Sequence, residues 1–419
     1  MYKKIEKCMI CGNDNLVPIL HLGDQALTGV FPKSKEEAVG VGPLELVKCH
    51  SDEDSGSVCN LVQLHHSFDG SEMYGLNYGY RSGLNKSMVR HLQDIVAYVQ
   101  TKVDLEERDL IIDIGSNDST LLQSYPSDKN LRLTGIDPTG VKFKEYYPSH
   151  IKLIPEFFSA DAVRGAYGDD KAKVVTSIAM IYDLEDPLSF VQQVHDVMAD
   201  DGIWVFEQSY LPAMIEANAY DTICHEHLEY YGMAQIQWMV EQAGLKIINV
   251  ELNDTNGGSF LLTVAKKDSI HEVSPTVQGV VEMENALNLN DLAPYEDFAK
   301  GVYAHKAELQ ELLKKLKENG ESVFGYGAST KGNVVLQYCG LTNEDIPYIA
   351  EVNEDKFGSF TPGTHIPIIS EKEARAMNPD HFFVLPWHFR KGILDRERDY
   401  MESGGKFIFP LPKIEIVGQ

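Results

Sequence analysis

The segment YDTICHEHLEYY (220–231) places two histidines on either side of a glutamate, a set of side chains that can move protons. A histidine whose pKa is near neutrality can take a proton from a carbon next to a carbonyl, and a neighbouring carboxylate can orient its ring. His225, Glu226 and His227 are therefore candidate catalytic residues. A hydrogen-bonded surface turn and a metal-binding His-x-His pair are the alternatives that this segment leaves open.

Four of the six cysteines lie in the first 60 residues, which suggests metal binding more than disulfides in a reducing compartment. Cys8 and Cys11 form a C-x-x-C turn that can direct two thiolates at one ion, and Cys49 and Cys59 can supply a second pair. Four thiolates in a tetrahedral array are the usual structural zinc site, with no coordination position open to substrate. The long gap between Cys49 and Cys59 leaves His50 as a competing fourth ligand. Unmetallated thiols and an iron–sulfur or redox centre are the alternatives.

A loop with a single glycine follows the apolar run LIIDIG (110–115) and continues as SNDS. Glycine between a buried strand and a helix lets the backbone approach a ligand closely. The G-x-G-x-x-G pattern of dinucleotide sites is missing, which favours a ligand with a cationic or zwitterionic tail over a pyrophosphate. Asp137 ends the next apolar run, where an acidic side chain can bind both hydroxyls of a ribose. Together these features predict S-adenosylmethionine, and a strand pair that binds nothing is the alternative. The residues assigned to this site are Asp113, Gly115, Ser116, Asn117, Asp118, Asp137, Phe158 and Met180.

A second glycine motif, SVFGYGASTKGN (322–333), joins a strand-like segment to a helix-like one. Gly325 and Gly327 can form an anion nest at the helix N-terminus, with the charge of Lys331 beside it, and this predicts a diphosphate site. Downstream, LPWHFRK (385–391) offers side chains that can stack on a base or pair with phosphate. A lone G-x-G is weak evidence, and a packed tryptophan beside a solvated basic turn remains an alternative. The candidate substrate-binding residues are Tyr78, Arg81, Asn256, Gly327, Lys331, Asn333, Trp387 and His388.

Composition limits the partners. The net charge is −26, so the surface repels nucleic acid and anionic lipid at long range. No apolar run reaches the roughly 20 residues that a membrane-spanning helix needs, and the first residues do not form a secretory signal. We expect a monomer in the cytoplasm, with neither nucleic acid nor membrane as partner.

The elements that must position these residues follow from hydrophobic periodicity. Between residues 110 and 208, short apolar runs alternate with helical stretches, which is typical of an α/β fold with a doubly wound, mostly parallel sheet. A helix is predicted from about Met88 to Gln100, and a long polar helix from about Tyr295 to Lys317. A second α/β unit is expected in the last ~100 residues, because further β-type runs follow SVFGYGA (322–328).

In combination, the C-x-x-C start, DIGSND (113–118), the Glu226-His227 pair, NGGSF (256–260) and GYGASTKGN (325–333) resemble the sugar C-methyltransferases. These enzymes act on nucleotide-linked 4-keto-6-deoxy sugars with S-adenosylmethionine. The resemblance extends from Cys8 to the C-terminus. It implies a zinc-binding module at 1–72, a Rossmann-like class I methyltransferase domain at 73–285 and a C-terminal Rossmann-like α/β domain at 286–419. A dTDP- or GDP-linked keto-sugar would lie between the last two domains.

The resemblance also implies roles for single residues. His227 matches the family's base and Glu226 the adjoining carboxylate, and the linker tyrosine falls on Tyr80, with Tyr78 as the alternative. The expected reaction is methyl transfer to C-3 of the sugar through an enolate.

Three departures from the family set this chain apart. Ser119 stands where the family usually has glycine, Cys224 occupies a place where some relatives have tyrosine, and the spacing from Cys49 to Cys59 is stretched. Cys224 therefore puts in doubt how the enolate is stabilised. The rival hypotheses are an O-methyltransferase acting on a nucleotide-sugar and a nucleotide-sugar-binding protein that has lost catalysis. A nicotinamide oxidoreductase using GYGAST lacks the third glycine.

Overall fold

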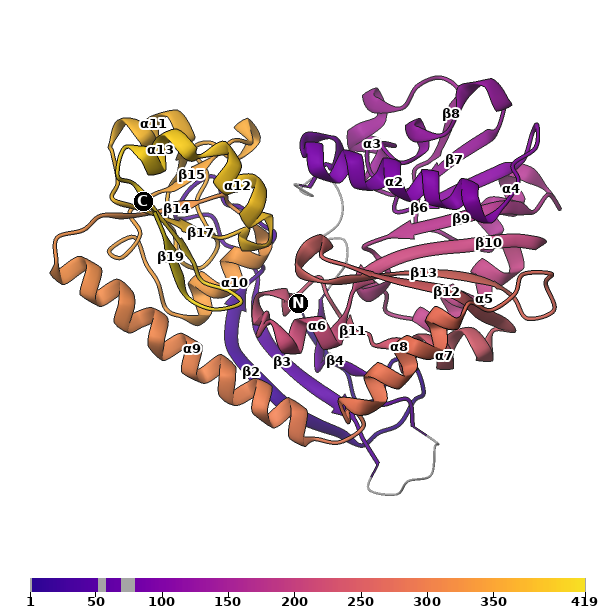
Figure 1. Ribbon diagram of the computed structural model, residues 1–419, viewed down its shortest axis with the longest axis horizontal. Coiled ribbons are helices and arrows are strands. Elements are labelled where there is room, and N and C mark those ends of the chain that lie inside the picture. The colour runs from indigo at the N-terminus through magenta and orange to yellow at the C-terminus, as the bar shows by residue number, and fades with distance from the viewer. Residues whose placement is uncertain (1, 52–57, 69–79, 419) are drawn as a thin grey trace.

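The computed structural model describes residues 2–51, 58–68 and 80–418, and its largest sheet has seven strands (Figure 1). The strand order is β12-β13-β10-β9-β6-β7-β8. The strands are β6 (Leu110–Ile114), β7 (Arg132–Ile136), β8 (Ile151–Ile154), β9 (Ala172–Ile178), β10 (Met198–Ser209), β12 (Leu245–Asn253) and β13 (Ser259–Lys266). Strands β6 to β10 are parallel to one another, and β13 is antiparallel to both β10 and β12. The predicted α/β sheet is confirmed.

Helices cover both faces of this sheet because its central strands are apolar on both sides. In β6, Ile111 packs with the buried residues of α2 (Lys86–Lys102). Leu110 and Ile112 pack instead with the buried residues of α4 (Ala160–Tyr167), α5 (Pro187–Val197) and α7 (Met233–Gln242). Successive side chains of a strand point to opposite faces, so β6 lies between two helical layers. The carboxyl ends of β6 and β7 form the edge at which such sheets bind ligands.

The N-terminal module is an antiparallel sheet with the order β11-β4-β3-β2. Its own strands are β2 (Leu16–Ala26), β3 (Val41–Cys49) and β4 (Val62–Leu64), whereas β11 (Glu229–Tyr230) comes from the segment that follows His227. A separate pair is formed by β1 (Tyr2–Lys4) and β5 (His66–Phe68). Main-chain hydrogen bonds therefore join the module to the chain around His227.

The C-terminal part has a six-stranded sheet with the order β16-β15-β14-β17-β18-β19, of which β19 alone is antiparallel to its neighbour. The strands are β14 (Val323–Tyr326), β15 (Ile349–Glu351), β16 (Ile368–Ser370), β17 (His381–Val384), β18 (Lys406–Phe409) and β19 (Glu415–Val417). The helices of this part are α10 (Thr330–Tyr338), α11 (Glu371–Ala376), α12 (Arg390–Arg396) and α13 (Arg398–Glu402). The second α/β unit expected from the sequence is present.

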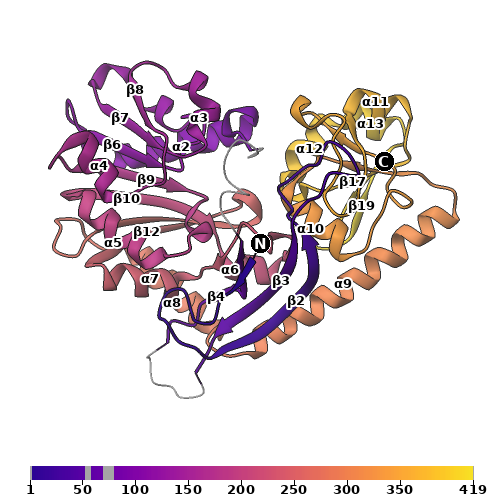
Figure 2. The same cartoon turned by 180° about the vertical axis from the view of Figure 1, so that it is seen from behind.

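The described residues also form the helices α6 (Leu211–Glu216), α8 (Pro275–Ala286) and α9 (Ala293–Glu318), with a single turn, α3 (Gly140–Phe143), after β7. The long α9 runs beside the β2–β3 ribbon toward the C-terminal part (Figure 2). Leu309 of α9, Leu46 of β3 and Val334 of α10 belong to one hydrophobic cluster. The N-terminal module and the C-terminal part thus share a core, which holds the C-terminal sheet in place relative to the ribbon.

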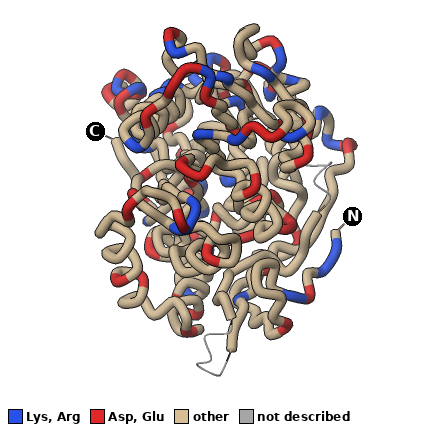
Figure 3. Tube along the Cα trace, turned by 90° about the vertical axis from the view of Figure 1, so that its right-hand side faces the viewer, with Lys and Arg blue, Asp and Glu red and all other residues tan. Residues whose placement is uncertain are grey.

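Basic residues are interspersed with acidic ones along the trace, as Figure 3 shows for one side of the molecule. Within the described ranges, none of the helices has both the length and the apolar character that a bilayer crossing requires.

Candidate active site and metal centre

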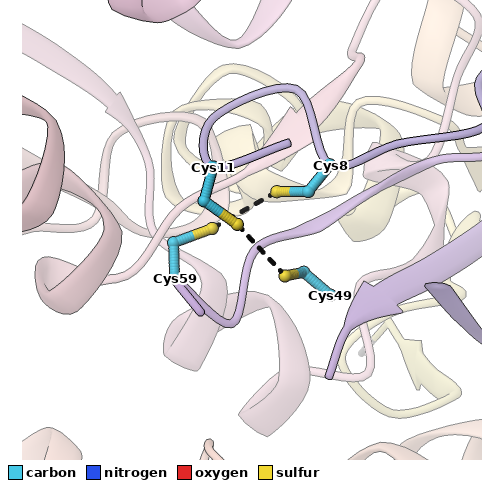
Figure 4. Close-up of side chains that lie close together, drawn as sticks. All are labelled: Cys8, Cys11, Cys49 and Cys59. Atoms are coloured by element: carbon cyan, nitrogen blue, oxygen red, sulfur yellow. Dashed lines mark hydrogen bonds between the residues drawn. The ribbon is translucent and has the colours of Figure 1, made fainter. Parts of the chain in front are cut away.

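Four cysteine thiols converge in the N-terminal module (Figure 4). Cys8 and Cys11 lie on the turn before β2, Cys49 ends β3, and Cys59 precedes β4. All four sulfur atoms lie within 4.8 Å of one another, with 3.3 Å between Cys8 and Cys59. Tetrahedral zinc with bonds of about 2.3 Å requires sulfur atoms roughly 3.8 Å apart, so the four thiols fit this metal. His50 is not part of the group, which removes it as the competing ligand.

Two buried polar side chains connect the metal site to the rest of the protein, and sequence reasoning missed both. The ammonium group of Lys48 donates a hydrogen bond to the carbonyl of Asn290, between α8 and α9, at 3.0 Å. The amide of Gln235, on α7, donates to the carbonyl of Cys59 at 2.9 Å. Such supporting contacts orient metal ligands, so the position of the cysteines depends on helices far along the chain.

The loop after β6 has the close-approach geometry that its glycine predicts. Gly115 has a φ of 73°, and a Cβ atom there would lie only 3.2 Å from the side chain of Met180. Asp113 is fully buried and accepts a hydrogen bond from the Thr176 hydroxyl at 2.6 Å. Burial raises the pKa of Asp113 to about 7. The loop therefore offers exposed backbone over a rigid base of buried side chains.

Asp137, at the end of β7, is held in one orientation by the cofactor loop and its own turn. One carboxylate oxygen accepts from the amide of Asn117 at 2.7 Å, and the other from the amide of Thr139 at 2.6 Å. The first of these oxygens retains a lone pair for a ribose hydroxyl, whereas the second also accepts from the Thr139 hydroxyl at 2.6 Å. The residues present thus fit an adenosyl group.

The chain before α2 covers this loop. The side-chain amide of Asn117 donates to the carbonyl of Tyr80 at 3.2 Å and accepts from the amide of Ser82 at 3.0 Å. Asp118 accepts from the amide of Gly83 at 2.9 Å. The backbone of Tyr80 therefore touches the cofactor loop, and the residue as a whole is 46% exposed.

The remaining predicted residues of this region have other contacts. Arg81 lies over the ring of Tyr146, 4.3 Å from its centroid, and is paired with Asp118 of the cofactor loop at 3.8 Å. The Ser116 hydroxyl lies 2.8 Å from that of Tyr147. Phe158 packs edge-on against a core phenylalanine of α5. Tyr78 lies outside the described residues.

Ser119 occupies the left-handed region with a φ of 62°, which costs a non-glycine residue about 1–2 kcal/mol. The buried hydroxyl of Ser119 donates to the carbonyl of Tyr146 and accepts from the side-chain amide of Gln123. These two hydrogen bonds offset the strain. Ser119→Ala is expected to lower the free energy of unfolding by about 1–3 kcal/mol, because it removes both hydrogen bonds and keeps the strain. Ser119→Gly relieves the strain and is expected to lose less. Urea unfolding measures both, and an alanine variant as stable as the glycine variant would contradict this account.

His227 has the geometry of a base. Its Nδ1 lies 2.8 Å from the carbonyl of Thr222, so Nδ1 carries the hydrogen and Nε2 keeps a lone pair. The ring packs against that of Tyr182, with centroids 4.4 Å apart, at a small cavity that both residues line. Burial and the charge of Lys331 lower the pKa of His227 to about 3, so the ring is neutral at pH 7.

Glu226 faces the N-terminal module instead of the His227 ring. Its carboxylate accepts from the Thr28 hydroxyl at 3.2 Å and lies against Gly29, where a Cβ atom would be 2.2 Å from Oε1. Burial raises the pKa of Glu226. The carboxylate therefore positions the segment against the connection between β2 and β3.

His225 points in a third direction, and the structure does not support its predicted catalytic role. Its Nε2 lies 3.3 Å from the carbonyl of Gly42, and its ring packs edge-on against Phe68 at 4.6 Å. Burial lowers the pKa of His225 to about 4. This fully buried ring packs within the N-terminal module and does not line the cavity of His227.

Several predicted substrate residues meet where the C-terminal part contacts two loops of the central part. The ammonium group of Lys331 donates to the carbonyl of Asn256 at 2.9 Å. The Trp387 indole donates at 2.7 Å to Asp221, whose other oxygen is buried without a hydrogen-bond partner among the described residues. Nδ1 of His388 is also buried and has no hydrogen-bond partner among the described residues. Asp221 was missed by sequence reasoning, although it lies in the same segment as His227.

The structure corrects the predicted diphosphate nest. Gly327 has the expected φ of 80°, but the amide of Ala328 donates to the Glu351 carboxylate at 2.7 Å. The Ser329 hydroxyl caps α10 by accepting from the amide of Gly332. Asn333, the last predicted residue of this motif, donates to the carbonyl of Thr28 and so ties α10 to the N-terminal module. The protein's own carboxylate thus occupies the place expected for the anion.

Three family models match the chain in succession: a zinc binding domain at residues 8–74, a methyltransferase domain at 80–250, and a C-methyltransferase C-terminal domain at 254–412. C-methyltransferase NovU of Streptomyces niveus is 28% identical over 418 residues, which are 99% of this chain and 97% of that protein.

Solved structures share less. The mitomycin 7-O-methyltransferase MmcR has a TM-score of 0.34 and 13% identity, over 44% of this chain and 55% of its own. The magnesium protoporphyrin IX methyltransferase of Synechocystis PCC 6803 has a TM-score of 0.32 and 12% identity, over 42% of this chain and 79% of its own. The assignment rests on the three family models and on NovU. The chain belongs to the S-adenosylmethionine-dependent C-methyltransferases that carry an N-terminal zinc-binding domain.

Proposed function

We propose that this enzyme transfers the methyl group to C-3 of a nucleotide-linked 4-keto-6-deoxy sugar, with His227 as the base. The observation that carries the proposal is the lone pair on Nε2 of His227, which the contact of Nδ1 with Thr222 leaves available. The ring packs on Tyr182, two residues after Met180, whose side chain covers Gly115 of the cofactor loop. The base and the cofactor loop are thus connected by one short segment.

The chemistry follows from this arrangement. A carbonyl at C-4 acidifies the hydrogen at C-3; Nε2 of His227 takes that proton, and the C–H electron pair forms the enolate double bond. When bound, S-adenosylmethionine supplies an electrophilic methyl group for the resulting carbon nucleophile. The protein holds Asp137 and the loop of Gly115 in place beforehand, so that the two reacting carbons are positioned without further reorganisation.

We place the nucleotide-sugar between the central and C-terminal parts. Lys331, Trp387 and His388 reach this region from the C-terminal part, and Asn256 from the central part. The charge of Lys331 and the stacking faces of the two aromatic rings suit a diphosphate and a base, respectively. We assign Tyr80 to the sugar side of the cofactor loop. A dTDP or GDP carrier, a monomeric state and a cytoplasmic location are parts of this proposal.

The test is a panel of keto-sugar nucleotides incubated in D₂O with methyl-¹³C S-adenosylmethionine and examined by NMR. The proposal expects a ¹³C-methyl on a quaternary carbon and deuterium at C-3 of unmethylated substrate. A methyl on oxygen would favour the rival O-methyltransferase. If calorimetry detects no S-adenosylmethionine binding, a catalytically silent binding protein would replace the proposal.

Removing the charge of Lys331 is expected to change the pH range of activity. That charge is the second cause, after burial, that lowers the pKa of His227, so Lys331→Met should raise this pKa above its value of about 3. Because the neutral ring is the active form, the acid limb of kcat/KM should then move to higher pH. NMR titration of the ¹³C-labelled imidazole measures the pKa directly. Lys306→Met, on α9, is the matched control, and equal midpoints for the two variants would refute the coupling.

A further inference from the structure

A buried carboxyl group lines the same cavity as His227 and has no hydrogen-bond partner among the described residues. Glu229 is 1% exposed, and neither of its carboxyl oxygens makes a hydrogen bond to any residue that the structure describes. The cavity is lined by Glu229, His227, Tyr182, Ser209, Tyr210 and Thr222, among others. A buried polar group without a partner costs free energy, so a ligand that completes its hydrogen bonds would bind favourably here.

Backbone pairing fixes this group relative to the base. Glu229 is the first residue of β11 and pairs with Gln63 of β4, and the amide of Leu228 donates to the Tyr182 carbonyl at 2.7 Å. The Gln63 side chain is engaged elsewhere, with the amide of Met9 and the carbonyl of Lys7. Because His227 and Glu229 line the same cavity, both side chains can contact one substrate group that enters it.

The surroundings favour the protonated form of this carboxyl group. Burial, reinforced by the negative charges of Asp183 and Glu185, raises the pKa of Glu229 well above its ordinary value. Glu185 itself is paired with Lys3 at the surface. A neutral carboxyl group has an O–H to donate, which a carboxylate lacks.

We propose that Glu229 is a second catalytic residue of this enzyme, a carboxylic acid that donates a hydrogen bond to the carbonyl oxygen of the substrate. This inference rests on the proposed function. As His227 removes the proton from the adjacent carbon, the C–H electrons form a carbon–carbon double bond and negative charge moves to that oxygen. The O–H of Glu229 stabilises this charge without giving up its proton. Neutral carboxylic acids in apolar sites stabilise enolates in this way.

Cys224 is a poor alternative to Glu229 as the hydrogen-bond donor to the enolate oxygen. The thiol of Cys224 is fully buried and lies near the Glu226 carboxyl group, which contacts the N-terminal module through Thr28. Burial also raises the pKa of this thiol well above its ordinary value, which makes it a weak donor. Glu229, on the cavity wall, is therefore a stronger donor than Cys224 for the enolate oxygen.

Two variants of equal length separate the roles of the O–H group and of packing. Glu229→Met fills the site but cannot donate, and it is expected to slow deuterium exchange at the carbon next to the carbonyl by about 10²–10³-fold, mainly in kcat. Glu229→Gln keeps an N–H donor and is expected to lose about tenfold or less. Glu241→Gln removes an exposed carboxylate of α7 that does not line the cavity, and it should exchange as the wild type does.

Infrared spectroscopy gives a readout that does not depend on turnover. Other buried carboxyl groups such as Asp113 contribute to the spectra of both proteins, so the readout is the difference between them. The wild-type minus Glu229→Gln difference spectrum at pH 7 should contain the carbonyl stretch of a protonated carboxylic acid. A difference spectrum without that band, or exchange by folded Glu229→Met at the wild-type rate, would overturn the inference alone. If the wild type exchanges no keto-sugar hydrogen, the proposed function fails, and this inference fails with it. Should Glu229→Met not fold, the band and the Glu229→Gln rate decide.

Discussion

Replacing His227 by glutamine is expected to lower the rate of methyl transfer by about 10²–10⁴-fold and to abolish hydrogen exchange at the carbon next to the substrate carbonyl. Glutamine can still donate to the carbonyl of Thr222, which now accepts from Nδ1 of His227 at 2.8 Å, but it has no basic nitrogen. The fold and the affinity for S-adenosylmethionine should therefore be preserved. Initial rates, deuterium exchange by NMR and calorimetry of cofactor binding measure the three quantities.

His195→Gln provides the control for this experiment. His195 lies on α5, is partly exposed and is paired with Asp196, so its replacement should leave rates and affinity unchanged. Exchange by His227→Gln at the wild-type rate would show that another group removes the proton. Loss of cofactor binding together with activity would show that His227 holds the loop rather than acting on the substrate.

The directions of the three neighbouring side chains could not be predicted from their sequence. His225 packs in the N-terminal module, Glu226 contacts the connection between β2 and β3, and His227 lines the cavity. These directions follow from the pairing of β11 with β4, a contact between residues far apart in the chain. Local sequence carries the residue types that the chemistry needs, whereas long-range strand pairing decides which of them lines the cavity.

Elements with a strong local period were predicted well. The helix expected from about Met88 to Gln100 is α2 (Lys86–Lys102), and that expected from Tyr295 to Lys317 is α9 (Ala293–Glu318). Apolar runs such as LIIDI became buried parallel strands, because an apolar stretch of that length is stable only between two layers. The C-x-x-C turn likewise identified the metal site, since its spacing directs both thiols to one point.

The expected diphosphate nest shows where local motifs mislead. The glycines give the predicted backbone at Gly327, yet Glu351, at the end of β15, hydrogen-bonds the amide of Ala328. A turn can present free donors only if no side chain from a neighbouring strand reaches them, and the glycine spacing carries no information about that side chain. The nucleotide is therefore better sought at Lys331, Trp387 and His388. Beside them, Nδ1 of His388 and one oxygen of Asp221 are buried without a hydrogen-bond partner among the described residues.

Loss of the zinc is expected to unfold the N-terminal module and to disorder the segment of His227. Structural zinc contributes about 10–16 kcal/mol of apparent binding free energy in zinc-finger peptides, so a module built around it does not fold without it. Cys49→Ser, or treatment with a strong chelator, should release the zinc and disrupt the strand pairing of β4. Because β4 pairs with β11, the segment of His227 should lose order as well. Metal analysis, the thermal unfolding midpoint and hydrogen exchange at the amides of Leu64 and Leu228 measure these effects.

Cys339→Ser is the matched control, since this buried cysteine contacts the hydroxyl of Tyr220 and lies outside the group of four thiols. It should keep its zinc and the amide protection of β4. If Cys49→Ser loses zinc but β11 stays protected, the module would be a separate unit with no part in holding the base. Protection lost in β4 and β11 together would show that the metal acts on catalysis through strand pairing, because its four thiol ligands leave no position for a substrate.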